Sequence, residues 1–279
     1  MKLLRHTSTA FILTGIVACA LYGSSCTYAR KVIAKDKLNQ GVIAFNEGHR
    51  ETAKVLFRDA IDYYPDNAVA WLYLGAALVK DYMEQDKDEA KKKELANEAL
   101  KTFDKALSLS GSNCTNKDNA ISNIAAIYDD LKDDDSWRTW MLRRTEDSCI
   151  NKEAKVSSYK AVAIKYWNCA LEQTTRYADK AKLAANDMWH YRDMDYPAAL
   201  ADKRKAEDCT NRGLEYIEKA LQEDPEDGNA LIYKGMLYRE RQMMTKDPEK
   251  RKELDQLARQ IYDQAVILLK QRETERNKK

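Results

Sequence analysis

Small, aromatic and proline residues at fixed distances constrain the fold of this chain more than any other feature. Within residues 34–67, Gly41, Ala53, Phe57 and Ala60 stand at positions 8, 20, 24 and 27, and a proline stands at position 32. The small residues allow two antiparallel helices to approach closely, the aromatic ring fills the gap between them, and the proline ends the second helix. This spacing predicts a hairpin of two helices.

The spacing recurs four more times, which indicates a repeat protein. The second copy has Gly75 and Phe103 at the equivalent of positions 8 and 24, and the fifth has Gly235 and Tyr262. The third copy is degenerate around Trp137–Thr145, where an arginine replaces a small residue. The five copies lie near residues 34–67, 68–113, 114–150, 154–227 and 228–268.

This pattern resembles the tetratricopeptide repeat (TPR) family over roughly residues 31–268. The resemblance implies an all-α solenoid of about five helix-hairpin repeats. It also implies that the first helix of each hairpin lines a concave groove that holds a peptide or a partner helix.

Composition agrees with an all-α fold. The 279 residues include only nine glycines and four prolines, under 5% of the chain, so the frequent turns of a β-sandwich or barrel are excluded. Charged residues make up 33% and hydrophobic residues 44%, which excludes a disordered chain and a multi-span membrane protein. Without residues 1–25, which contain Lys2 and Arg5, acidic and basic residues balance, so we expect no nucleic-acid partner.

The resemblance further implies which side chains line the groove, at positions 2, 5, 9, 12 and 13 of each first helix. The main candidates are Leu38, Val42, Phe45, Val69, Leu72, Lys160, Ile164, Trp167, Ile232, Met236, Arg239 and Glu240. The first two repeats would present an apolar groove. The lysines and asparagines with which the family clamps a peptide carboxylate are missing, since Leu38 and Val42 hold positions 5 and 9 of the first repeat.

The N-terminus predicts a signal peptide over residues 1–25 and a tether over 26–33. Lys2 and Arg5 precede a short stretch of apolar and small residues, 11–23, that is too short to span a bilayer comfortably. Cys26 and, alternatively, Cys19 follow small residues as in the bacterial lipobox. Lipidation of Cys26 leaves an even number of other cysteines, as an oxidising compartment favours. We therefore expect a protein anchored in the bacterial cell envelope, facing the periplasm or exterior; an ordinary signal peptide or an uncleaved anchor is the alternative.

Four further cysteines suit two disulfide bonds. Cys169 and Cys209 flank an excursion within the fourth repeat, where two antiparallel helices would bring them within reach of each other. Cys114 and Cys149 end consecutive repeats, which allows a second bond between them. Buried free thiols are the alternative.

The excursion adds about 38 residues to the fourth repeat. It predicts two helical arms with a break near residues 193–197. Trp189, Tyr191 and Arg192 lie near that break, and they form either a recognition tip or side chains that pack back on the solenoid. The excursion could also be a sixth, degenerate repeat. Shorter charged inserts in repeats 2 and 5 predict helices longer by a turn or two.

The sequence contains no recognisable catalytic motif. It has three histidines, one of them in the expected signal peptide, and lacks the zinc, nucleophile-elbow and phosphate-loop patterns. We therefore expect no enzymatic activity, no cofactor, no metal and no small-molecule substrate. The expected function is a protein-interaction scaffold; the alternatives are a self-assembling structural protein and an enzyme regulator that binds through the excursion. Residues 269–279 are assigned to a basic C-terminal tail.

Overall fold

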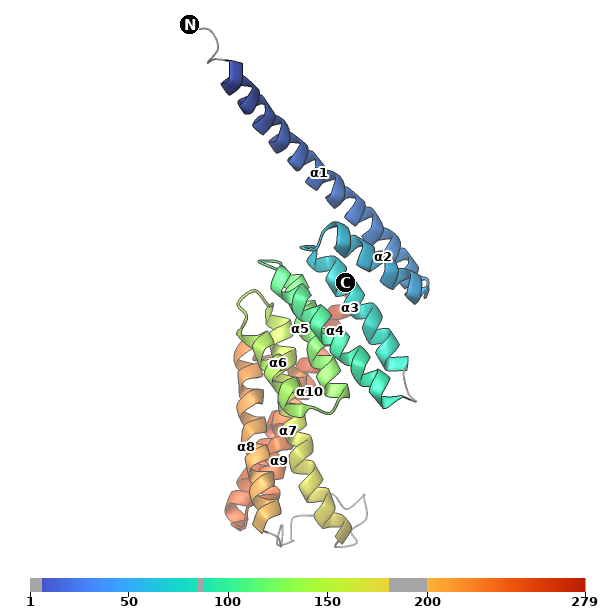
Figure 1. Cartoon of the computed structure of the whole chain (residues 1–279). Coiled ribbons are helices and arrows are strands. Elements are labelled where there is room, and N and C mark those ends of the chain that lie inside the picture. The colour runs from blue at the N-terminus through green and yellow to red at the C-terminus, as the bar shows by residue number, and fades with distance from the viewer. Residues whose placement is uncertain (1–6, 85–87, 181–199, 279) are drawn as a thin grey trace. The chain divides into compact units, whose positions relative to one another are not determined.

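The computed structural model describes residues 7–84, 88–180 and 200–278, with side chains described for 27–84, 88–174 and 203–278. These residues form ten helices and no strand, so the all-α prediction is confirmed (Figure 1). The helices are α1 (Thr7–Asn46), α2 (Arg50–Tyr63), α3 (Ala68–Glu84), α4 (Glu89–Leu109), α5 (Cys114–Asp130), α6 (Asp134–Glu146), α7 (Lys152–Lys180), α8 (Leu200–Glu223), α9 (Gly228–Met244) and α10 (Pro248–Arg276).

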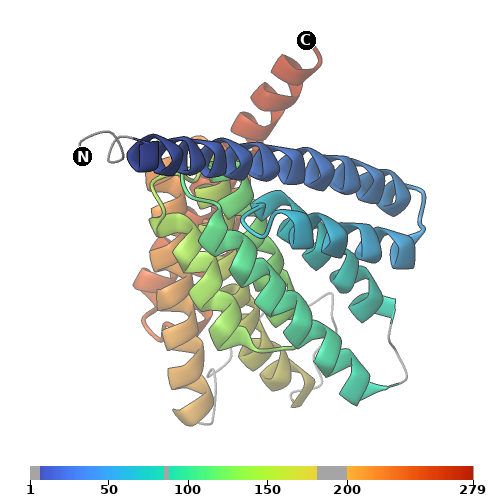
Figure 2. The ribbon, with the colours of Figure 1, turned by 45° about the horizontal axis from the view of Figure 1, so that its top comes forward.

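Consecutive helices pair into hairpins in the order that the repeats predict. The C-terminal half of α1 lies along α2, and α3 lies along α4 (Figures 1 and 2). The α7–α8 and α9–α10 pairs pack in the same way. Neighbouring first helices also touch, α1 with α3, α3 with α5, and α7 with α9, as successive hairpins of a solenoid do.

The close approach within each of the first two hairpins depends on a glycine opposite an aromatic ring. A Cβ at Gly41 would lie 2.6 Å from the ring of Phe57, and a Cβ at Gly75 would lie 2.8 Å from the ring of Phe103. Both rings are fully buried. Positions 8 and 24 of the repeat are therefore in direct contact, as the sequence pattern predicts.

The chain divides into two compact units, the first ending at Trp137 and the second beginning at Arg138. We describe each unit by itself. The division falls within α6, the second helix of the degenerate third repeat. That helix has an arginine where the other repeats have a small residue.

Several helices are longer than a standard repeat requires. In the fifth repeat α10 has 29 residues and runs to Arg276, through most of the segment that we assigned to a C-terminal tail. Its start is fixed by the Asp247 carboxylate, which accepts hydrogen bonds from the backbone N–H groups of Glu249 and Lys250, with Pro248 in the first turn.

The two helical arms of the excursion are present, since α7 extends to Lys180 and α8 begins at Leu200. Trp189, Tyr191 and Arg192 lie outside the described residues. At the other end of the chain α1 is continuous over 40 residues and includes the segment 26–33 that we assigned to a tether. Within the described residues, no helix combines the length and the apolar character that crossing a membrane requires.

Candidate protein-binding surfaces

The expected groove of the first unit is formed by α1 and α3, which contact each other. Leu38, Val42, Phe45 and Val69 are half-buried, so each keeps part of its apolar surface accessible. Leu72 is 9% exposed and belongs to the core of the unit. Its assignment to the groove surface is therefore wrong: position 5 of the second repeat faces inward here.

In the second unit the expected groove residues of α7 and α9 make contacts with one another's helices. The Lys160 ammonium donates a hydrogen bond to the Asp227 carboxylate at 2.6 Å. The Trp167 ring meets the Tyr233 ring edge to face, with 5.7 Å between ring centres. The other expected groove residues of this unit are half-buried as well: Ile164, Ile232, Met236 and Arg239.

Glu240 was expected at the groove surface, and this expectation is also wrong. The side chain is 4% exposed and lies against α7, where the Thr174 hydroxyl donates a hydrogen bond to its carboxylate at 3.3 Å. Burial raises the pKa of Glu240 to about 7, although the hydrogen bond from Thr174 opposes that effect. In the family pattern this position is a surface position, so the sequence contained no signal for its burial.

A second polar group is buried in the same unit without a partner. The Thr210 hydroxyl of α8 makes no hydrogen bond, although its residue is fully buried. Asn211 beside it accepts a hydrogen bond from Arg241, the residue after Glu240, at 2.8 Å. The register of α8 on α9 therefore places Thr210 at the same level as Glu240.

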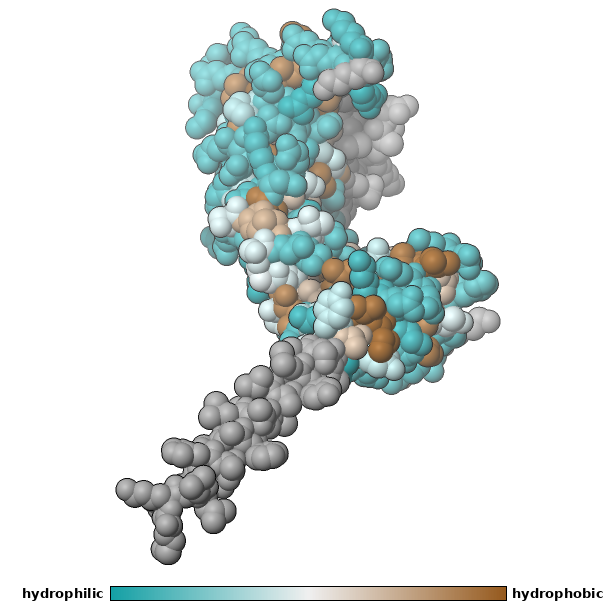
Figure 3. Space-filling model, turned by 90° about the horizontal axis from the view of Figure 1, so that it is seen from above, coloured by the Kyte–Doolittle hydropathy of each residue, from teal (hydrophilic) through white to brown (hydrophobic). Residues whose placement is uncertain are grey.

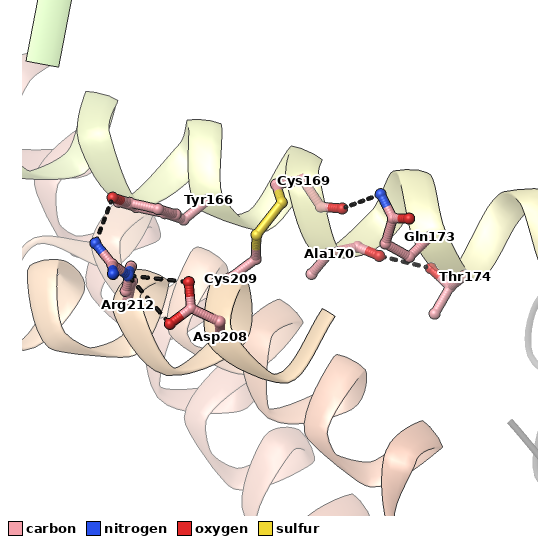
Figure 4. Close-up of a disulfide and its surroundings, with 8 residues drawn as sticks. All are labelled: Tyr166, Cys169, Ala170, Gln173, Thr174, Asp208, Cys209 and Arg212. Atoms are coloured by element: carbon pink, nitrogen blue, oxygen red, sulfur yellow. Dashed lines mark hydrogen bonds and ion pairs between the residues drawn. A yellow bond between two sulfur atoms is a disulfide. The ribbon is translucent and has the colours of Figure 1, made fainter. Parts of the chain in front are cut away.

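The predicted disulfide bond between Cys169 and Cys209 is present and joins α7 to α8 (Figure 4). The Cα atoms are 6.0 Å apart, within the usual range for a disulfide. One turn away, Arg212 of α8 pairs with Asp208 at 3.0 Å and donates a hydrogen bond to the Tyr166 hydroxyl of α7 at 3.5 Å. The base of the excursion is thus held by a covalent bond and a polar bridge.

Cys114 and Cys149 are each disulfide-bonded in the structure as well. They belong to different units, so the pairing of these two cysteines with each other stays a prediction.

Two adjoining hollows lie in the first unit, and sequence reasoning missed them. Their volumes are about 440 and 510 Å³, and α2, α3 and α4 supply the lining of both. None of the expected groove residues lines either one. Both hollows are lined by second helices of hairpins, whereas the expected groove uses first helices. The first hollow is lined by Glu51, Lys54, Arg58, Leu78, Asp81, Glu84, Lys91, Leu95 and Glu98. The second is lined by Arg58, Ile61, Asp62, Trp71, Leu74, Glu98, Lys101, Thr102 and Lys105.

Charges in the first hollow are paired with one another. The ammonium of Lys54, a buried residue, contacts the carboxylates of Glu51 and Asp81, and Arg50 binds Glu84 beside them. Burial lowers the pKa of Lys54, but the hydrogen bonds to Asp81 and Glu51 raise it by more, so the ammonium stays charged. This hollow therefore has little net charge to offer a ligand.

The surface shown in Figure 3 is mostly hydrophilic, with separate small apolar areas. Exposed apolar side chains include Ile43 of α1, at 57% exposed, and Val55 of α2, at 56%. Among the residues whose side chains are described, no cluster of His, Cys, Asp or Glu could hold a metal ion.

No protein-family model matches the chain, and no curated protein matches it by sequence. Three solved structures are similar in fold. YrrB, described as a TPR protein with an unusual peptide-binding site, is 15% identical with a TM-score of 0.43, over 83% of this chain and 84% of that one. The MamA protein is 12% identical with a TM-score of 0.42, over 87% and 94%. PilF of Pseudomonas aeruginosa is 14% identical with a TM-score of 0.43, over 86% and 90%.

The order of the helices and their packing define the class of this protein as an α-solenoid of helix hairpins. The glycine-to-aromatic contacts between positions 8 and 24 identify these hairpins more narrowly as tetratricopeptide repeats.

Proposed function

We propose that this chain is a protein-interaction scaffold that binds an apolar segment of a partner protein in the groove of α1 and α3. The proposal rests on one observation: Leu38, Val42, Phe45 and Val69 stay half-accessible on two helices that touch. Covering such surface contributes roughly 25 cal/mol for each Å² removed from water. The groove therefore favours a partner with apolar anchors, such as one face of an amphipathic helix.

The chemistry of these four residues also decides against a carboxylate ligand in this groove. Leu38 and Val42 offer no hydrogen-bond donor at the positions where the family's carboxylate clamp has polar side chains. A partner's charged terminus would lose its hydration there without a replacement. Recognition in this groove therefore depends on apolar contacts.

The same proposal includes a lipid anchor at Cys26 that holds the protein at a membrane of the bacterial envelope. The basic and apolar start of the chain and the disulfide-bonded cysteines support it. Mass spectrometry of the mature N-terminus tests this part. A diacylated cysteine at position 26 is expected, and an unmodified N-terminal residue would disprove the anchor.

Two neighbouring residues of α1 provide a matched test of the groove. Val42 is half-buried in the groove, whereas Ile43 is 57% exposed on another side of the helix. In cells that express Val42→Glu, cross-linking from native membranes should recover at least about ten-fold less partner than wild type, because a carboxylate in the groove loses hydration when the partner binds. Ile43→Glu should recover as much as wild type. Equal recovery by both variants would show that the groove is not the binding surface.

A further inference from the structure

We propose that the space between α2 and α4 is a second binding surface, which takes an acidic segment of a partner protein that carries a large apolar side chain. The surface consists of the two adjoining hollows described above. It differs from the groove proposed for α1 and α3, because its walls are the second helices of the first two hairpins.

Matching stripes of three helices form this surface. The lining residues of α3 include Trp71, Leu74 and Leu78, which recur at the three- and four-residue spacing of one helix face. On α4 the lining runs from Lys91 to Lys105, a distance of roughly 20 Å along the helix. A segment of about six extended residues fits this length.

The two ends of the surface differ in chemistry. Arg58 and Glu98 line both hollows, and their ion pair at 3.0 Å crosses from α2 to α4 between them. At the α3 N-terminal end, the apolar side chains of Ile61, Trp71 and Leu74 line the larger hollow. This end is the docking position for an apolar side chain.

Polar groups at this end already have partners, so the pocket does not call for a polar ligand side chain. The indole N–H of Trp71 donates to the carbonyl of Pro65 at 2.8 Å, and the Thr102 hydroxyl donates to the carbonyl of Glu98 at 2.7 Å. A half-buried tryptophan with its ring fixed in this way is the kind of side chain that anchors protein interfaces.

Charge selects the flanks of the ligand. Lys101 and Lys105 are exposed on the rim, and neither has an ion pair among the described residues. They stand one turn apart on α4, where like charges repel each other and destabilise the helix. Asp62 lines the same hollow with the opposite charge, so the lining has an excess of one positive charge. Carboxylates on either side of the ligand's apolar residue would relieve the repulsion.

Fluorescence anisotropy on the full chain in non-ionic detergent tests the proposal. The probe is a labelled heptapeptide in which one phenylalanine stands between two pairs of acidic residues, with glycine at each end. It should bind saturably. Replacing its phenylalanine with alanine, or its acidic residues with lysines, should weaken binding at least about ten-fold.

Charge reversal of the rim separates this site from general attraction. K101E/K105E should weaken the acidic probe about ten-fold and should strengthen the lysine version, a gain that an unfolded variant could not show. K35E/K93E makes the same change at exposed lysines outside the hollows, and it should alter binding less than about two-fold.

Three results would overturn the proposal: absence of saturable binding, equal effects of the two double variants, or loss of probe binding in Val42→Glu. The last result would place the acidic probe in the groove of α1 and α3. Undiminished probe binding by Val42→Glu would instead establish two independent surfaces, whatever the outcome of the partner cross-linking.

Discussion

The two units of this protein hold their helices together by different means. In the first unit, buried aromatic rings fill the space opposite glycines, as Phe57 does against Gly41, and its charged residues lie around open hollows. In the second unit, the Cys169–Cys209 bond closes the α7–α8 hairpin, and the carboxylate of Glu240 is buried between helices.

This difference separates a surface suited to ligands from a fold that responds to its surroundings. Half-exposed ion pairs such as Arg58 with Glu98 contribute at most about 1 kcal/mol, so a ligand can replace them at little loss. A disulfide and a buried carboxylate contribute several kcal/mol, and both depend on solution conditions. We therefore expect ligand binding in the first unit, and sensitivity to reductant and pH in the second.

The largest expected effect is on the first unit. Phe57→Ala should lower the free energy of unfolding by about 3–5 kcal/mol, because it removes a fully buried ring and leaves a cavity beside Gly41. Hydrogen exchange followed by mass spectrometry should show faster exchange in α1 and α2, with the amides of α8 to α10 unchanged.

Tyr63→Ala serves as the control for Phe57→Ala, because Tyr63 is an exposed aromatic residue of the same helix. It should change the free energy of unfolding by less than about 0.5 kcal/mol. If Phe57→Ala accelerated exchange equally in both units, the two would unfold as one cooperative block, and the contrast between them would not extend to stability.

The core of each hairpin could be predicted from the sequence, because residue size alone decides it. A glycine at position 8 and an aromatic residue at position 24 contact each other wherever two helices pack this closely. The Cys169–Cys209 bond followed from the same hairpin geometry. Helix ends were less predictable. The α10 helix continues beyond the repeat to Arg276, and its last turns are rich in charged residues, which have high helix propensity.

The next largest effect tests the covalent brace of the second unit. Cys169→Ser with Cys209→Ser should lower the free energy of unfolding by about 3–4 kcal/mol, because the bond joins residues 40 apart in sequence and restricts the unfolded chain. Thermal unfolding of the oxidised protein measures the loss. Adding a reductant to wild type should reproduce the part that belongs to this bond.

A single double-serine variant keeps the other two bonded cysteines intact, which provides the control. Hydrogen exchange should quicken in α7 and α8 and stay unchanged in α1 to α4. Unaltered stability in the variant would contradict the view that the second unit depends on its covalent bond.

The candidate surfaces were harder to predict than the fold, for a physical reason. The hollows between α2 and α4 arise where side chains of three helices fail to fill a space, and no residue type marks such a gap in a sequence. Glu240 was placed at the groove because the family pattern makes its position a surface position, yet α7 covers it here. Whether a position is covered depends on the neighbouring helix, and the sequence around Glu240 does not contain that information.

The smallest of the three effects concerns the pH response of Glu240. Its pKa is about 7 in the folded protein, against an ordinary value of 4.5. Below pH 4.5 both the folded and the unfolded state are protonated at this residue. Between pH 4.5 and 7 the folded state keeps a proton that the unfolded state has lost, so stability falls as pH rises, by roughly 3 kcal/mol in total. Above pH 7 the full loss is present.

Glu240→Gln should remove this dependence, because an amide of the same size cannot ionise. Urea unfolding at pH 5 and pH 8 should show the variant gaining about 2–3 kcal/mol relative to wild type between the two values, with its advantage at pH 8. Glu223→Gln makes the same change at an exposed position of α8 and should follow wild type at both pH values. A constant difference between Glu240→Gln and wild type across this range would mean that Glu240 keeps the same protonation in the folded and unfolded states. In that case the second unit would respond to reductant but not to pH.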